Sequence, residues 1–564
     1  MSIRSERHSI GAFQMDPANN VGPTNNVGKD RRVMDRKATF AAVAIGLVIS
    51  CVTSVLAQST PAPRPAGTPA IPADRKAFND ANKIAEPEKK IEAFEKFVTD
   101  FPDSFAISQA NQIVLTTMVK AWPDQQDRIL AHAKKTIATA QDPLKGSVYN
   151  FVVSTLVEGG ILLDRAEEMA REGLTWVEED QAKRLRQARA PYLASLGRLY
   201  LKRGKTKEAD KYLRDAISAS PQLMEATLGL AELYEKKNDD AAALGYYASA
   251  SLTGRMKPEP REKFYAVYRK SHNGTLNGIE ELLDLRYRKD FPTPVKVEHY
   301  TAPATRTERI VLAEIFTGSG CPPCVAADLA FDAYMERYPR KDLAVLMYHL
   351  HIPLPDPMTN PSSQARGKYY AVSGVPSYAI DGEKNSGGGS REMTRDFYNR
   401  VAPTLEKRLT VAPDARIVLD AVADTGAVKV KATADQIKGG SKIKLQIALA
   451  EDVLRFSGEN GIRFHPMVVR SMAGPDAGGF VVDASKANSI EWTFDLNKIT
   501  QELKAHLDDF EAQRKDDKFA FAQKKHEIDP SALTVVAFVQ DDETKQILQA
   551  VSIKLKPAIA SAEK

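Results

Sequence analysis

The spacing of hydrophobic residues divides the chain into a helical part and a strand-rich part. From residue 76 to 290, apolar residues recur three or four positions apart, which is the period of amphipathic helices. From residue 309, short apolar runs such as RIVLAEIF and LAVLMYHLHI stand between turn residues, as buried strands do. From residue 412 to 557, segments such as AVKVKATAD alternate apolar and polar residues, which is typical of half-buried strands. We therefore expect a multidomain protein with an all-α array, an α/β domain and a mostly β domain.

The helical part contains an internal repeat of 34 residues. Small and large apolar residues recur at this period in two successive units. The matching positions are Leu196 and Leu230, Gly197 and Ala231, Tyr200 and Tyr234, and Ala209 and Ala243. This period, with small residues where two helices touch, resembles the tetratricopeptide repeat (TPR) family. The resemblance implies about four to six helical hairpins over residues 76–290 and a concave surface that binds a protein partner. The alternative role for such an array is that of a spacer or an oligomerisation element.

The segment 306–409 has the element order of an α/β domain. A strand (RIVLAEIF), an amphipathic helix (CVAADLAFDAYMERY), a second strand (LAVLMYHLHI), a short strand (in GVPSYAIDG) and a final helix follow one another. A strand, helix and strand at this spacing predict a βαβ unit with a parallel strand pair. The segment 287–308 contains prolines and has no helical period, so we place the boundary to the array there.

The segment 412–557 is expected to form a separate β-sandwich. About seven strand-like runs are separated by turn signals and interrupted by one charged helix in KITQELKAHLDDFEAQRKDD. This pattern favours two sheets packed face to face. His465 begins one of these strands without an Asp or Ser companion, and we interpret it as a structural residue.

Composition and charge argue against nucleic acid as a partner. The 564 residues are 43% hydrophobic and 27% charged, as in ordinary globular proteins. The net charge is +5, and residues 1–57 account for much of it, with seven Lys or Arg against four Asp or Glu. The remaining positive excess is too small to indicate nucleic-acid binding.

The N-terminal segment 1–57 has the features of an export signal. The basic run RRVMDRK precedes the uncharged apolar run ATFAAVAIGLVIS, and Val55 and Ala57 occupy the −3 and −1 positions of a cleavage site. A Pro- and Ala-rich linker, 58–75, follows. We therefore expect a periplasmic or secreted protein. Two alternatives are a single membrane anchor formed by the apolar run and a lipoprotein signal in VISC, which would anchor the protein to the envelope through a lipid on Cys51.

Of the three cysteines, only Cys321 and Cys324 remain after removal of the leader. An exported protein with so few cysteines is not stabilised by a disulfide framework. The Cys-Pro-Pro-Cys motif by itself fits a redox catalyst, a metal clip or a structural disulfide. A disulfide here closes a very short loop and constrains the unfolded chain little. A structural zinc usually needs four ligands, and His349 or His351 would have to complete the set; sulfur ligands also suit copper.

Two motifs in the α/β segment resemble the thioredoxin superfamily. VLAEIFTGSGCPPC runs from a strand into the cysteine pair, and SGVPSYAIDG follows further along the chain. The resemblance implies that Cys321, at a helix N-terminus that stabilises a thiolate, is the nucleophile, and that Cys324 resolves the mixed disulfide. It also implies that Val375 and a cis Pro376 lie beside the cysteines and contact the substrate. The buried acid Glu314 would relay the proton from Cys324.

Glu314 departs from the family pattern, since it lies seven residues before Cys321 where the family usually has Asp at six. The chain departs from that pattern at two further places. Gly320, rather than the usual tryptophan, precedes Cys321, and the run SGGGS occupies residues 386–390 in place of a regular turn or last strand. Both departures affect the surface on which the family binds its substrates rather than the redox pair.

The combined prediction is an exported thiol–disulfide oxidoreductase that acts on protein disulfides and serves cell redox homeostasis. Catalytic roles are expected for Cys321, Cys324, Glu314 and Pro376, and substrate contact for Val375 and Pro376. We expect no metal and no cofactor beyond the redox-active Cys321–Cys324 disulfide, and a protein partner on the TPR-like array. The alternatives are a cell-envelope scaffold or assembly protein with a secondary redox pair, and a copper-binding protein of thioredoxin fold. The direction of the reaction depends on the reduction potential of the pair, which the motif does not specify.

Overall fold

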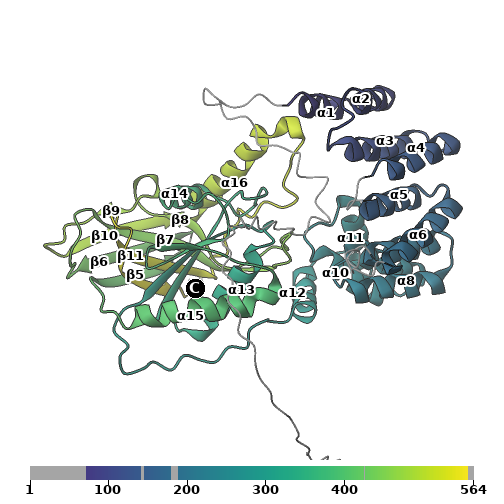
Figure 1. The fold of residues 1–564 in the computed structure, drawn as a ribbon. Coiled ribbons are helices and arrows are strands. Elements are labelled where there is room, and N and C mark those ends of the chain that lie inside the picture. Colours follow the sequence, from purple (N-terminus) through teal and green to yellow (C-terminus); the bar gives the residue numbers. More distant parts are fainter. Residues whose placement is uncertain (1–71, 141–144, 180–188, 425, 557–564) are drawn as a thin grey trace, which may run out of the picture. The chain divides into compact units, whose positions relative to one another are not determined.

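The computed structural model describes residues 72–140, 145–179, 189–424 and 426–556. The export signal, its cleavage site at Ala57, Cys51 and the linker up to residue 71 lie outside the described residues. A helical array comes first in the described chain, and a strand-rich region follows it (Figure 1).

The first part of the described chain is a helical repeat array, as the apolar spacing predicts. Its small residues lie where the helices meet: a Cβ atom added to Gly197 would lie 2.5 Å from Cγ of Leu213 on the next helix. Ala209 and Ala243, which are 34 positions apart, are both fully buried. The predicted TPR-like array is therefore confirmed. Its helices are α1 (Ala73–Lys83), α2 (Pro87–Asp100), α3 (Ile107–Ala121), α4 (Gln126–Ala138), α5 (Lys145–Gly159), α6 (Leu163–Glu179), α7 (Arg189–Lys202), α8 (Thr206–Ala219), α9 (Met224–Lys236), α10 (Asp240–Ser251), α11 (Pro258–Ser271) and α12 (Ile279–Asp290).

The strands after the array form one large mixed sheet and one small sheet. In the described residues the large sheet has nine strands, in the order β12-β11-β7-β8-β2-β1-β3-β4, with β9 beside β7. β1 and β2 are parallel, as the predicted βαβ unit requires, and β2 is also parallel to β8. The strands of this sheet are β1 (Val311–Thr317), β2 (Leu343–His349), β3 (Ser377–Ile380), β4 (Glu383–Ser386), β7 (Ile443–Arg455), β8 (Phe464–Met472), β9 (Phe480–Val481), β11 (Leu533–Asp541) and β12 (Ile547–Lys554).

The predicted boundary between domains 306–409 and 412–557 does not separate two sheets. β8 pairs with β2, so the C-terminal strands extend the sheet that begins with β1. β11 is buried along its whole length, as are β1 and β2. Strands that are buried on both faces have nearly continuous apolar runs, and LTVVAFVQD is one of them. The prediction that this strand, β11, belongs to an independent C-terminal sandwich was therefore wrong.

Part of the expected sandwich is present. A three-stranded antiparallel sheet has the order β10-β6-β5, with β5 (Arg416–Asp424), β6 (Ala427–Asp435) and β10 (Asn488–Asp495). Its inner face shares an apolar core with β7, β11 and the helix α16 (Leu496–Gln513). Val428 and Val430 of β6, for example, are buried there. Two sheets thus pack face to face, but the larger one also carries the α/β elements.

Three further helices cover the two faces of the large sheet. α14 (Pro361–Tyr369) lies on one side, and α13 (Cys324–Arg337) and α15 (Thr394–Leu409) lie on the other (Figure 1). Because successive side chains of a strand point to opposite faces, β1 contacts both layers. The hydroxyl of Thr317 donates to Asp328 of α13, whereas Glu314 accepts from Arg366 of α14.

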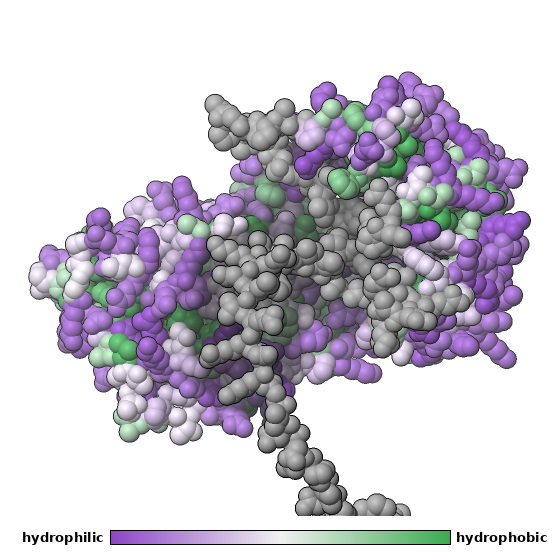
Figure 2. Space-filling view, in the orientation of Figure 1, coloured by the Kyte–Doolittle hydropathy of each residue, from purple (hydrophilic) through white to green (hydrophobic). Residues whose placement is uncertain are grey.

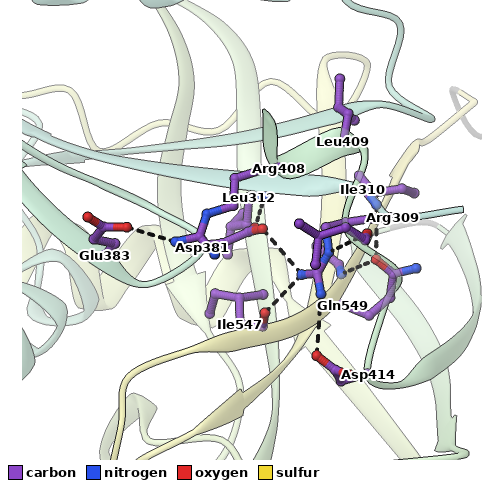
Figure 3. A network of polar contacts seen from close by, with 12 residues as sticks. Arg309, Ile310, Leu312, Asp381, Glu383, Arg408, Leu409, Asp414, Ile547 and Gln549 are labelled. Atoms are coloured by element: carbon purple, nitrogen blue, oxygen red, sulfur yellow. Dashed lines mark hydrogen bonds and ion pairs between the residues drawn. The ribbon is translucent and has the colours of Figure 1, made fainter. Parts of the chain in front are cut away.

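A buried arginine just before β1 binds residues from three distant segments of the strand-rich region (Figure 3). Arg309 is 1% exposed, and its guanidinium donates to Asp381 after β3 and to the carbonyl oxygen of Ile547 in β12, both at 3.2 Å. The same group donates to the carbonyl oxygen of Val411 and lies 3.5 Å from Asp414, just before β5. The segment around residues 411–414, where the sequence predicted a domain boundary, is therefore joined to the large sheet by hydrogen bonds and ion pairs of Arg309.

On the face shown in Figure 2, hydrophilic residues dominate, and hydrophobic residues are scattered in small groups. Within the part of the chain that the structure describes, no helix combines the length and the apolar character needed to span a membrane.

Candidate active site

The two cysteines lie where β1 passes into α13, and they form a disulfide with an S–S distance of 2.08 Å. The turn between them is closed by backbone hydrogen bonds: the N–H of Cys321 donates to Gly318 at 3.0 Å, and the N–H of Cys324 donates to Cys321 at 3.2 Å. α13 begins at Cys324, so the pair lies at the positive end of the helix dipole. This position favours a thiolate when the disulfide is reduced.

The loop before β3 lies against the first cysteine. The Val375–Pro376 peptide bond is cis, as expected. The Sγ atom of Cys321 is 3.7 Å from the carbonyl oxygen of Val375. The structure therefore brings together four of the predicted site residues: Cys321, Cys324, Val375 and Pro376.

Both cysteines are covered. Cys321 is 1% exposed and Cys324 is fully buried, whereas Pro322 and Pro323 between them are exposed. Residues 456–463, the connection between β7 and β8, lie against the turn just before Cys321, and we call them the covering loop. Within it, the backbone N–H of Asn460 donates to the carbonyl oxygen of Ser319 at 3.0 Å. Because both cysteines are buried, a substrate can reach the sulfur atoms only if a neighbouring segment moves.

Glycines allow the other neighbouring segments to approach the site closely. A Cβ atom on Gly388 would lie 2.1 Å from the carbonyl oxygen of Pro323 and 2.5 Å from Cγ of Pro376. A Cβ atom on Gly320 would lie 3.0 Å from the side chain of Leu354. A side chain at Gly388, in the SGGGS run, would therefore collide with the backbone of Pro323, and a side chain at Gly320 would be in tight contact with Leu354.

Glu314 is not joined to the cysteine pair. Its carboxylate makes a two-point ion pair with Arg366, at 2.7 and 2.8 Å, and accepts from the hydroxyls of Tyr348 and Tyr370. Thr317, three residues later in β1, points to the helix that carries Cys324. Because an odd separation in a strand reverses the face, Glu314 points to the opposite side of the sheet. The structure therefore does not support Glu314 as the acid that serves Cys324.

A different buried acid, Asp328, lies on the same helix as the second cysteine. It follows Cys324 by four residues and is 5% exposed. The hydroxyl of Thr317 donates to its Oδ2 at 2.8 Å. Burial raises the pKa of Asp328 to about 7, against the lowering effect of that hydrogen bond. Sequence reasoning missed this residue, although its spacing of four from Cys324 on a helix was a usable signal.

A histidine–aspartate pair supports the turn before the cysteines. Asp356 is fully buried, lies 3.0 Å from Nδ1 of His349, and accepts from the backbone N–H of Ser319 at 2.6 Å. Burial raises the pKa of this carboxyl, but His349 and backbone N–H groups outweigh burial and lower the pKa to about 2. Asp356 therefore remains charged and holds Ser319 beside the site.

The other candidate histidines have separate partners. His351 accepts from the backbone N–H of Asp356 and stacks on Phe510 of α16, with ring centroids 3.9 Å apart. Burial lowers the pKa of His351 to about 4 and that of His465 to about 3, so both are neutral near pH 7. Over the described ranges, no group of three or more His, Cys, Asp or Glu residues is arranged to hold a metal ion.

Comparison with known proteins identifies the repeat. A family model described as tetratricopeptide repeat matches residues 193–225, which cover most of α7, all of α8 and the start of α9. A search of curated proteins finds no match for the chain. The matched unit lies within the helical array, and repeats of this kind indicate interaction with other proteins.

Proposed function

We propose that this chain is an exported thiol–disulfide oxidoreductase with a thioredoxin-like α/β core, and that the Cys321–Cys324 pair exchanges disulfides with protein substrates. The observation that carries the proposal is a disulfide at a strand-to-helix junction, placed 3.7 Å from the carbonyl oxygen that precedes Pro376. A disulfide that closes so short a loop adds little stability. The helix dipole, in contrast, suits a reactive thiolate.

The reaction has two steps with balanced electron pairs. In the reduced protein, the Cys321 thiolate attacks one sulfur of a substrate disulfide; a mixed disulfide forms, and the other substrate sulfur leaves as a thiolate. The Cys324 thiolate then attacks Sγ of Cys321, the bond to the substrate breaks, and the second substrate thiolate leaves. The substrate gains two electrons and the protein ends as the disulfide. Run backwards, the same steps oxidise a substrate dithiol.

The test is the reduction of insulin disulfides with dithiothreitol as the electron source. We expect the wild-type protein to accelerate reduction, and the variant Cys324→Ala to accumulate a mixed disulfide on Cys321 that mass spectrometry detects. Equilibration with glutathione then gives the potential and the preferred direction. Absence of both acceleration and mixed disulfide would remove the oxidoreductase proposal.

The covering loop should limit access to Cys321. A Cβ atom on Gly458 would lie 2.6 Å from the carbonyl oxygen of Ser319, so Gly458→Ala should push the loop away from the site. Such overpacking costs about 1–3 kcal/mol, which corresponds to a roughly 5- to 150-fold larger open fraction. We expect iodoacetamide to alkylate reduced Cys321 faster by a factor in this range, measured in the Cys324→Ala background.

The matched control for the covering loop is Gly374→Ala. Gly374 is near the site, and no atom lies within 4 Å of a Cβ added there, so the alkylation rate should not change. Equal rates in Gly458→Ala and Gly374→Ala would show that the loop does not govern access.

A second candidate function is that of a cell-envelope scaffold or assembly protein, which the repeat match favours. The repeat array is also bonded to the covering loop, through α12 and through the connection between α10 and α11. Arg463 donates to Asp284 of α12 at 2.7 Å, and Arg255 donates to the carbonyl oxygen of Glu459 at 3.2 Å. Affinity capture from an envelope extract with wild type and Cys321→Ser separates the roles: a partner retained by both binds independently of the redox pair.

A further inference from the structure

The covering loop is bonded to the turn that leads into Cys321. The backbone N–H of Asn460 donates to the carbonyl oxygen of Ser319 at 3.0 Å, and its side-chain amide donates to the carbonyl oxygen of Gly318 at 3.4 Å. The same Gly318 oxygen accepts from the N–H of Cys321 at 3.0 Å. A displacement of Asn460 therefore removes two of the bonds that hold the turn in which the first cysteine lies.

A buried arginine bonds the same loop to the helical array. Arg463 is 2% exposed, and its Nε donates to the carboxylate of Asp284 in α12 at 2.7 Å. Its Nη2 donates to the carboxylate of Glu280, also in α12, at 2.6 Å. Both carboxylates that pair with Arg463 in the described chain thus belong to the array. Because a buried charge without a partner is strongly unfavourable, the loop is stable in this position while α12 lies against it.

Two exposed or half-buried arginines add further bonds to the loop. Arg255, in the connection between α10 and α11, donates to the carbonyl oxygen of Glu459 at 3.2 Å. Arg391, directly after the SGGGS run, donates to the carbonyl oxygen of Gly461 at 3.3 Å and to the hydroxyl of Tyr287 in α12 at 3.0 Å. The covering loop therefore connects the array with two segments that adjoin the cysteine pair.

The array and the strand-rich region are not tightly packed beside this contact. A cavity of about 1080 Å³ lies there, and it is lined by Asp284 and Arg288 of α12, Asp332 of α13 and Arg455 of β7. Next to Asp284, hydrogen bonds and ion pairs rather than closely packed side chains join the two parts. A contact of a few such bonds can open locally without global unfolding.

We propose that the bond of Arg463 to Asp284 is a clamp by which the helical array controls access to the redox site. This inference rests on the proposed function and names a way in which that function is regulated. While α12 binds Arg463, the covering loop keeps its bonds to the turn before Cys321. When α12 withdraws, Arg463 loses its charge partners, the loop leaves the turn, and Cys321 becomes accessible. A protein bound to the array can therefore open the site by moving α12.

The first test compares the accessibility of Cys321 with and without the Asp284 carboxylate. Both proteins carry Cys324→Ala, so that Cys321 is the one remaining thiol of the described chain. We expect iodoacetamide to alkylate Asp284→Asn about 5- to 150-fold faster, which is the range of ordinary coupling between two sites. Hydrogen exchange of the peptide 456–463 should accelerate by a similar factor, because both measurements report the open fraction of the loop.

Two control variants separate the clamp from general effects on the array. Glu281→Gln removes an exposed carboxylate of the same helix, which lies 3.8 Å from Arg455. Gly197→Ala disturbs the packing of α7 on α8, since a Cβ atom there would lie 2.5 Å from Cγ of Leu213. Neither variant should change the alkylation rate. An acceleration in Gly197→Ala equal to that in Asp284→Asn would mean that any loosening of the array exposes the site, and it would reject the clamp.

A double variant tests whether the clamp acts through the covering loop. Gly458→Ala pushes the loop off the carbonyl oxygen of Ser319, so the loop has already left the turn in this variant. Adding Asp284→Asn should therefore accelerate alkylation little further. Two independent routes to the site would multiply their effects instead, and a multiplicative double variant would reject the route through the loop.

Failure of the clamp can be told apart from failure of the proposed function, because alkylation needs no substrate disulfide. If the wild-type protein neither reduces insulin nor forms a mixed disulfide, the oxidoreductase function fails. If it does both, and Asp284→Asn keeps the alkylation and exchange rates of its background, only the clamp is overturned. If Asp284→Asn does not fold, as judged by circular dichroism, Arg255→Met decides. This variant removes one hydrogen bond between the array and the loop, and we expect alkylation about 2- to 10-fold faster. An unchanged rate would reject the proposal.

Discussion

Replacing Cys321 by serine is expected to lower insulin reduction by about 1,000-fold or more, to the rate of dithiothreitol alone. The hydroxyl of serine cannot form the mixed disulfide, and loss of a covalent nucleophile typically removes several orders of magnitude of rate. The measurement is the initial rate of insulin precipitation at fixed dithiothreitol. The site has no other described cysteine besides Cys324 that could take over the attack.

The control for this result is the stability of the variant. Because the Cys321–Cys324 disulfide closes a short loop, its loss should change the thermal unfolding temperature little. Cys324→Ser should differ from Cys321→Ser, since it keeps the nucleophile and traps the substrate. Full activity in Cys321→Ser, or trapping by Cys321→Ser rather than by Cys324→Ser, would show that the roles of the two sulfurs are assigned incorrectly.

Replacing Arg366 by methionine is expected to lower the free energy of unfolding by about 3–5 kcal/mol, because it leaves Glu314 as a buried, unpaired charge. Arg366 is 4% exposed and bonds both oxygens of this carboxylate. Burial lowers the pKa of Arg366, but the Glu314 carboxylate outweighs burial and raises it, so the guanidinium is charged at neutral pH. Urea unfolding followed by circular dichroism measures the loss.

Two variants test whether charge, rather than volume, causes the effect of Arg366→Met. The double variant Glu314→Gln/Arg366→Met removes both charges and keeps an acceptor for Tyr348, so it should recover most of the lost stability. Lys431→Met breaks an exposed ion pair with Glu491 and should cost at most about 1 kcal/mol. A loss in Arg366→Met no larger than in Lys431→Met would mean that Glu314 is neutral in the folded protein.

The array and the α/β order could be predicted because their signals are local. The 34-residue period places Gly197 and Ala209 where two helices touch, and each contact lies within one hairpin of the chain. The strand that ends at Thr317, the helix that starts at Cys324 and the parallel partner β2 also follow one another along the sequence. Neighbours in sequence are neighbours in space here, so apolar periodicity is sufficient.

The separate C-terminal domain could not be excluded from the sequence, because the decisive pairing is non-local. β2 pairs with β8 through Met347 and Val468, and nothing in either strand specifies the other. An apolar run such as LTVVAFVQD fits a sandwich core and the centre of a mixed sheet equally well. Arg309, which looked like the start of a strand, binds Asp381 and Ile547 from distant segments.

By itself, the sequence determined the repeat array, the β1–α13 junction and the cysteine pair, since each depends on spacing along one short segment. Tertiary structure alone decided where the Glu314 carboxylate points and which loop lies against the turn before Cys321. Glu314 and Thr317 are three residues apart, and the reversal of faces along β1 sends one to Arg366 and the other to Asp328. The covering loop, which is more than 130 residues further along the chain, donates to the carbonyl oxygen of Ser319. Such contacts arise from packing of distant elements, and residue patterns do not encode them.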